Sequence, residues 1–256
     1  MNRKNLLLEQ DETFGIGMNG EILSVQFALY AAEDLTAADG SVIPKDGLIE
    51  IVSCDENGKA VFITDIPVGS SLYVKEYSAD EHYLISDKSY PVLFEYAGQD
   101  IETVYISINN GEAISNDLIR GSVLGKKVDE DGFAVGGAVF GLFKAGETEF
   151  TEETALMTAE ANEIGVFLFE DVPYGNWLIR ELKPAPAFVL NENVYPVTVS
   201  ENEETVEITV ENRFITGAVQ TTKVDAEYPD NKLTGAVFEV YLDGGCLMDR
   251  YLKTKD

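Results

Sequence analysis

The 256-residue chain contains one histidine, and only 18 lysine and arginine residues against 46 aspartate and glutamate residues. A single histidine, His82, cannot supply a multi-histidine metal site, and it argues against a Ser-His-Asp triad. The net charge of -28 repels phosphate groups, which argues against binding to nucleic acid or to an anionic membrane surface. We therefore expect no metal, no cofactor and no nucleic-acid partner, with His82 in a surface loop.

Cysteine and long apolar runs are also scarce. Cys54 and Cys246 are too far apart to suggest a disulfide framework, so we expect both to be free and packed. No apolar run reaches the length of a membrane span, and Leu6-Leu7-Leu8 is too short for a secretory signal. Since 45% of the residues are hydrophobic, packed cores are still expected. The ending of the chain suggests a piece of a longer protein, with no membrane insertion in this segment.

One phrase occurs twice in the chain. Residues 116–129 (NDLIRGSVLGKKVD) recur 96 positions later as residues 212–225 (NRFITGAVQTTKVD). A period of this length is typical of a domain. The chain thus divides into residues 1–117, residues 118–214 and residues 215–256, of which the last is the start of a truncated third domain.

Strand patterning dominates the sequence. Apolar and polar residues alternate over Val206–Asn212, and turn dipeptides such as Asp131-Gly132 occur at short intervals. This rhythm predicts an all-β fold of tandem β-sandwiches. Weak helix signals are confined to residues 30–38 and 152–161. Residues 129–132 (DEDG) contain three acidic residues, but they lack the further ligands of a calcium loop and predict a hairpin turn.

Three polar residues of the second domain fall on the inward face of their strands. Lys127 follows Val123 and Gly125, Glu181 follows Trp177 and Ile179, and Asn212 follows Val206, Ile208 and Val210, in steps of two. The neighbouring Lys126 has the opposite parity, and the repeat has Thr222 in its place. Because burying such polar groups singly is costly, we expect Lys127, Glu181 and Asn212 to meet.

Burial gives this cluster a possible chemistry. Desolvation lowers the pKa of a lysine and raises that of a glutamate, so a neutral amine beside a protonated carboxyl is plausible. Such an amine can attack the Asn212 carboxamide and displace ammonia, with Glu181 moving the protons. The same pattern also fits a buried Lys-Glu ion pair next to Asn212 without any bond.

The motifs of the second domain occur in a characteristic order. They are Gly121-x-Val123-x-x-x-Lys127-Val128-Asp129, Gly137-Ala138-Val139-Phe140, Asp171-Val172-Pro173-Tyr174-Gly175, residues 180–186 (RELKPAP) and Val210-Glu211-Asn212. This set resembles the B-type domain of collagen adhesins, or SpaA-like pilin domain, of Gram-positive bacteria. The resemblance implies prealbumin-like (Ig-like) β-sandwiches at the cell surface, attached to the cell wall through regions outside this chain. It also implies a Lys127–Asn212 isopeptide bond promoted by Glu181.

The other two domains carry only part of this set. Glu76 and Asn116 match Glu181 and Asn212, but the position aligned with Lys127 falls near Phe14-Gly15-Ile16, where no lysine stands. Lys4 would need another strand register, so we predict no cross-link in the first domain. Lys223 matches Lys127 in the third domain, without a downstream Glu or Asn.

The sequence favours a structural role over an enzymatic one. We expect a stalk or adhesin segment joined to other domains of a surface protein, with one autocatalytic bond and no turnover. Pilin polymerisation is not favoured, because the family's Tyr-Pro-Lys element reads Tyr90-Pro91-Val92 and Tyr195-Pro196-Val197 here. The alternative is a module that binds a host extracellular matrix protein or glycan through residues 31–47 or 146–162, where Leu35, Val42 and Ile43 are the apolar hints.

Overall fold

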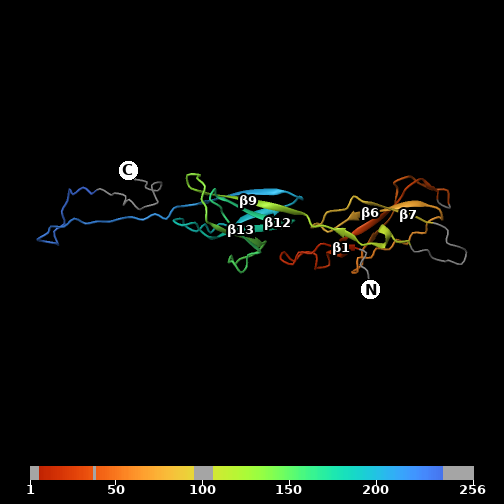
Figure 1. The fold of residues 1–256 in the computed structure, drawn as a ribbon, viewed down its shortest axis with the longest axis horizontal. Helices are drawn as coiled ribbons and strands as arrows, with labels where there is room; N and C mark the ends of the chain where they lie inside the picture. The colour runs from red at the N-terminus through yellow and green to blue at the C-terminus, as the bar shows by residue number, and fades with distance from the viewer. Residues whose placement is uncertain (1–5, 37–38, 95–105, 239–256) are drawn as a thin grey trace. The chain divides into compact units, whose positions relative to one another are not determined.

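The computed structural model describes residues 6–36, 39–94 and 106–238. It forms two compact units, Met1–Ile215 and Thr216–Asp256, and the first of these contains two β-sandwiches (Figure 1). The described residues form strands and two short 3-10 helices, η1 (Glu21–Ser24) and η2 (Asn109–Gly111). The all-β prediction is confirmed. Both helix signals are wrong, since residues 30–31 and 157–160 lie in strands; residues 37–38 are outside the described ranges.

The second sandwich consists of a four-stranded and a three-stranded sheet. The antiparallel four-stranded sheet has the order β11-β10-β13-β14, with β10 (Val139–Lys144), β11 (Met157–Glu160), β13 (Gly175–Lys183) and β14 (Tyr195–Val199). The other sheet has the order β12-β9-β15, with β9 (Arg120–Asp129), β12 (Val166–Pro173) and β15 (Thr205–Asn212). Strands β9 and β15 are parallel neighbours. The first and last strands of this domain therefore lie side by side.

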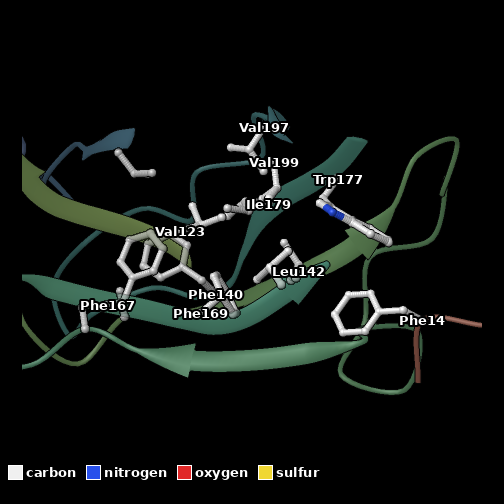
Figure 2. Packing of buried hydrophobic residues seen from close by; sticks show 14 of the residues in the cluster. Phe14, Val123, Phe140, Leu142, Phe167, Phe169, Trp177, Ile179, Val197 and Val199 are labelled. Carbon is white, nitrogen blue, oxygen red and sulfur yellow. The ribbon is translucent and has the colours of Figure 1, made fainter. Parts of the chain in front are cut away.

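Both sheets contribute side chains to one core, of which Figure 2 shows a part. Phe140 of β10 stacks on Phe167 of β12 with ring centroids 3.8 Å apart. Gly125 of β9 faces this pair, and a Cβ atom there would lie 1.9 Å from the Phe167 ring. A side chain at position 125 is therefore excluded. Trp177 is buried in the same core, as its strand parity predicts.

The first sandwich has a similar but smaller arrangement. Its four-stranded sheet has the order β5-β2-β6-β7, with β2 (Gln26–Ala31), β5 (Leu48–Ser53), β6 (Ser71–Ser78) and β7 (Ser89–Leu93). Two further pairs are β1 (Leu6–Leu8) with β8 (Ile114–Asn116), which are parallel, and the hairpin of β3 (Leu35–Thr36) with β4 (Val42–Ile43). Cys54 is free and buried in this core, as predicted, and burial raises its pKa to about 11. Cys246 lies outside the described residues.

A long connection between β1 and β2 packs on the core of the second sandwich. Phe14, on the red part of the ribbon in Figure 2, meets Trp177 edge to face with ring centroids 4.9 Å apart. Arg120, at the start of β9, forms ion pairs of 2.9 Å with both Glu9 and Asp11. These contacts explain why the two sandwiches form one compact unit.

The smaller unit is described only as far as residue 238. Within residues 216–238 a single bridge joins Val224 to Lys232, and none of the named strands is present. Val219 and Val237 are each 90% exposed. The described part therefore does not form the opening strands expected at the start of a third domain, and residues 239–256 lie outside it.

Candidate functional site

Lys127 is a lysine whose side chain is fully buried. Its Nζ donates to the carbonyl oxygen of Val128 at 2.8 Å and to that of Val210 at 3.3 Å. The ammonium lies 5.8 Å from the centroid of the Phe188 ring. Burial lowers the pKa of Lys127, and the negative charges of neighbouring carboxylates, that of Glu181 first, oppose this shift only in part. The site thus shifts the amine toward its neutral, nucleophilic form.

Glu181 and Asn212 form a buried pair. Nδ2 of Asn212 donates to both carboxyl oxygens of Glu181 at 2.8 Å. The backbone N–H of Asn191 donates to Oε2 of Glu181 at 2.7 Å. Burial raises the pKa of Glu181, although these hydrogen bonds and the charge of Lys127 act in the opposite direction. Oδ1 of Asn212 is buried and has no hydrogen-bond partner.

The strand register brings the three side chains to one region. Lys127 of β9 pairs with Val210 of β15, so Asn212, two residues further along, projects on the same face. Glu181 comes from β13 in the other sheet. The ion pairs of the described residues do not include one between Lys127 and Glu181. The hydrogen bonds of the Lys127 amine instead go to the carbonyl oxygens of Val128 and Val210.

Lys126 lies on the opposite face of β9, as its parity predicts. Its Nζ forms an ion pair of 2.8 Å with Glu207, and both side chains are more than half exposed. Lys126 cannot reach the core without a change of register. Lys127 is therefore the lysine of β9 that is buried in the sandwich, on the face that Asn212 of β15 shares.

Some residues of the site were not found from the sequence. Phe188 and Phe214 pack together at the end of the core with ring centroids 4.4 Å apart, and Asn191 holds Glu181 through its backbone N–H. A signal for the last contact exists in the repeat. Ser86 follows Glu76 by ten residues, as Asn191 follows Glu181, and its backbone N–H donates to Glu76 in the same way.

The first sandwich repeats the carboxyl-amide pair. Nδ2 of Asn116 donates to Oε1 of Glu76 and, at 3.2 Å, to the carbonyl oxygen of Leu84. Both Glu76 and Asn116 are buried, and burial raises the pKa of Glu76. Oδ1 of Asn116, like that of Asn212, is buried without a hydrogen-bond partner.

The lysine position of the first sandwich is not where the sequence alignment put it. In the parallel pair of β1 and β8, Leu6 pairs with Ile114, two residues before Asn116, as Lys127 pairs with Val210 before Asn212. Leu6 is therefore the counterpart of Lys127. The alignment to residues 14–16 is wrong because the connection after β1 has 17 residues (9–25), whereas the connection after β9 has nine (130–138). Lys4 lies outside the described residues.

The remaining sequence candidates lie elsewhere. Lys223 is exposed, and its carbonyl oxygen accepts from the backbone N–H of Leu233 at 2.9 Å. His82 is in a loop but only partly exposed, because it contacts Asp80 at 2.6 Å and the Tyr174 ring edge to face. Residues 129–132 form the predicted turn, in which the carboxylate of Asp129 accepts two backbone N–H groups. Over the described ranges no cluster of His, Cys, Asp or Glu could hold a metal ion.

The two candidate binding loops offer little apolar surface. In the described parts of residues 31–47 and 146–162, the only large hydrophobic residue among the exposed ones is Val42. Leu35 is partly buried against the core of the first sandwich. No helix in the described parts of the chain is long and apolar enough to cross a lipid bilayer. The buried cluster is thus the better candidate for a functional site.

Comparison with known proteins agrees with the fold. Residues 121–213 match the SpaA family, described as a prealbumin-like fold domain. Among solved structures, the Bacillus anthracis TIE protein aligns with a TM-score of 0.55 and 18% identity over 77% of this chain and 32% of that one. The chain thus spans about a third of that protein, and at this identity the match establishes the fold alone. No curated protein matches the sequence.

Two pilus proteins align less closely. A C-terminal fragment of the pilus adhesin SpaC from Lactobacillus rhamnosus GG aligns with a TM-score of 0.47 and 11% identity, covering 84% of this chain and 98% of that one. GBS52, the minor pilin of Streptococcus agalactiae, aligns with a TM-score of 0.34 and 16% identity, covering 78% of this chain and 87% of that one.

Proposed function

Since residues 121–213 belong to the SpaA family of prealbumin-like domains, we propose that the chain is a stalk segment of a bacterial cell-surface protein. In this proposal its second sandwich closes itself with an isopeptide bond between Lys127 and Asn212. The observation that carries the proposal is the position of these two buried side chains on one face of β9 and β15, the parallel first and last strands of the domain. The attachment to the cell wall would be provided by other regions of the protein.

The bond follows from the chemistry of the three side chains. The neutral amine of Lys127 attacks Cγ of Asn212, and a new Nζ–Cγ bond forms. Glu181, whose raised pKa favours the protonated form, donates to Oδ1 after a flip of the amide, which exchanges its oxygen and nitrogen. The carboxyl group then moves a proton from Nζ to Nδ2, the Cγ–Nδ2 bond breaks, and ammonia leaves. Glu181 is regenerated, but the substrate is consumed, so the reaction occurs once per chain.

A stalk gains mechanical resistance from this bond. Because β9 and β15 are parallel neighbours, a force that pulls on the two ends of the domain shears the whole ladder from Ser122–Thr205 to Asp129–Asn212. Hydrogen bonds alone yield to a sustained load. A covalent link from Lys127 to Asn212 would carry the load past residues 128–211, so these residues could not be extended.

The bond can be tested by the intact mass of the denatured protein. We expect the parent to be lighter than its sequence by one ammonia, and Glu181→Ala to have its full sequence mass. Glu76→Ala is the matched control, because it removes the equivalent carboxyl of the first sandwich and should retain the loss. A parent with its full sequence mass would sink the proposed bond.

The stalk role can be tested by pulling single molecules from both ends. Without a bond, as in Lys127→Met, unfolding of the second sandwich should release the 84 residues between Lys127 and Asn212, or roughly 300 Å of extended chain. The parent should lack this extension, and Leu6→Met should behave like the parent. An equal extension in the parent and in Lys127→Met would argue against a load-resisting stalk.

A further inference from the structure

The first sandwich contains most of a second cross-linking site. Glu76 and Asn116 are buried and in hydrogen-bond contact, and the backbone N–H of Ser86 holds Oε2 of Glu76 at 2.8 Å. The amide oxygen of Asn116 is unpartnered. Glu76 thus corresponds to Glu181, Asn116 to Asn212, and the backbone N–H of Ser86 to that of Asn191. The electrophile and the proton-transfer group are therefore both in place.

The backbone around this pair is also repeated. Tyr83 and Leu118 form a bridge that corresponds to the bridge between Phe188 and Phe214. The N–H of Leu84 donates to the carbonyl oxygen of Asp117 at 2.9 Å, as the N–H of Val189 does to that of Arg213. Tyr83 thus stands where Phe188 lies near the Lys127 ammonium, and its side chain is likewise buried.

The difference is at Leu6. The register of β1 with β8 puts this residue at the position that Lys127 occupies in the second sandwich, and Leu6 is fully buried in the core. A leucine has no nucleophile, so the arrangement of Glu76 and Asn116 has nothing to react with. Two neighbours of the pair also differ, since Leu8 pairs with Asn116 where Asp129 pairs with Asn212, and Tyr83 replaces Phe188, but neither supplies the electrophile or the proton-transfer group.

We propose that Glu76 and Asn116 form a latent acylation site for a primary alkyl amine, silent because Leu6 occupies the position of the amine. This inference rests on the chemistry proposed for the second sandwich. The amine nitrogen would form a bond to Cγ of Asn116, and the Cγ–Nδ2 bond would break. The carboxyl group of Glu76 would take the proton from the amine and deliver it to the departing nitrogen, which leaves as ammonia.

A single substitution tests the proposal. Leu6→Lys supplies the amine at the required register, and its intact mass should show the loss of one more ammonia than the parent. Leu6→Lys with Glu76→Gln should not show the additional loss. Digestion should yield one branched peptide that contains positions 6 and 116. A folded Leu6→Lys protein without the additional loss would overturn the proposal.

The two proposals fail independently, because each sandwich contributes its own ammonia. If the parent and the Leu6→Lys variant each lose one ammonia, only the latent site is contradicted. A parent that loses none and a variant that loses one would contradict only the bond of the second sandwich.

A buried lysine in a three-residue strand could prevent folding, which circular dichroism would reveal. Leu6→Ala then replaces it, with n-butylamine added in excess to the folded protein. We expect Asn116 to gain the amine and lose ammonia, and Leu6→Ala with Glu76→Gln to stay unmodified. An unmodified Asn116 in the folded Leu6→Ala protein would overturn the proposal.

Discussion

The Lys127→Met variant removes the amine from the second sandwich and keeps an unbranched side chain of similar length. If Lys127 is bonded to Asn212 in the parent, a loop of 85 residues is closed, and the loop-entropy relation for a cross-link gives about 4 to 5 kcal/mol of stabilisation. The variant should lose this amount. Without a bond, the parent would bury an amine whose desolvation outweighs the attraction of the neighbouring carboxylates, and an apolar replacement would leave the stability unchanged or raise it. The two cases predict opposite signs.

Trp177 makes the measurement specific to the second sandwich. It is the single tryptophan of the chain and is buried in that core, so its fluorescence during urea unfolding follows that domain. We expect Lys127→Met to lower the free energy of unfolding by about 4 to 5 kcal/mol, or its melting temperature by on the order of 20 °C. Leu6→Met, the matched change in the first sandwich, should leave the Trp177 transition nearly unchanged. An equal or higher urea midpoint for Lys127→Met would refute the reasoning.

Three further predictions concern the packing and ionisation of the two cores. Gly125→Val should lower the stability of the second sandwich by about 3 kcal/mol, measured by tryptophan fluorescence in urea, because its side chain would overlap the Phe167 ring. The raised pKa of Glu76 means that its protonated form favours folding, a contribution that is complete at acidic pH and is lost as the pH rises through the folded-state pKa. The free energy of unfolding of Glu76→Gln, measured by urea unfolding at a series of pH values, should therefore not fall in this pH range. If the parent and Glu76→Gln differed by the same free energy at every pH, the raised pKa of Glu76 would be contradicted. In a Cys246→Ser background, Cys54 should resist iodoacetamide at pH 8 until the first sandwich unfolds, because its thiol is buried and its pKa is about 11.

Local alternation was sufficient to predict the fold and the inward faces. In a strand, the side of each residue follows from its parity, so Val210 and Asn212 could be assigned to the core without any knowledge of the partner strands. The repeat then linked Glu76 with Glu181, and the shared pairing of these residues with Phe27 and Phe140 agrees with that alignment. These features depend on a few neighbouring residues only.

The position of Leu6 depended on information that the sequence does not carry locally. The extra residues between β1 and β2 displaced the alignment, and a leucine in a short strand gives no sign that it occupies a lysine position. The same displaced alignment put Phe14 near the lysine position of the first domain. Phe14 instead contacts Trp177 of the second domain, and a contact between domains leaves no local pattern in the sequence. The support of Glu181 by Asn191 has no side-chain signature, because a backbone N–H donates there, and only the matching ten-residue spacing in the repeat indicates it.

Tandem mass spectrometry of the digested parent tests the central claim most directly. After proteolysis, the account predicts one branched peptide in which Nζ of Lys127 is joined to Cγ of Asn212, with ammonia lost, and predicts its absence from Glu181→Ala. Separate peptides carrying an unmodified Lys127 and an unmodified Asn212 in the parent would contradict it.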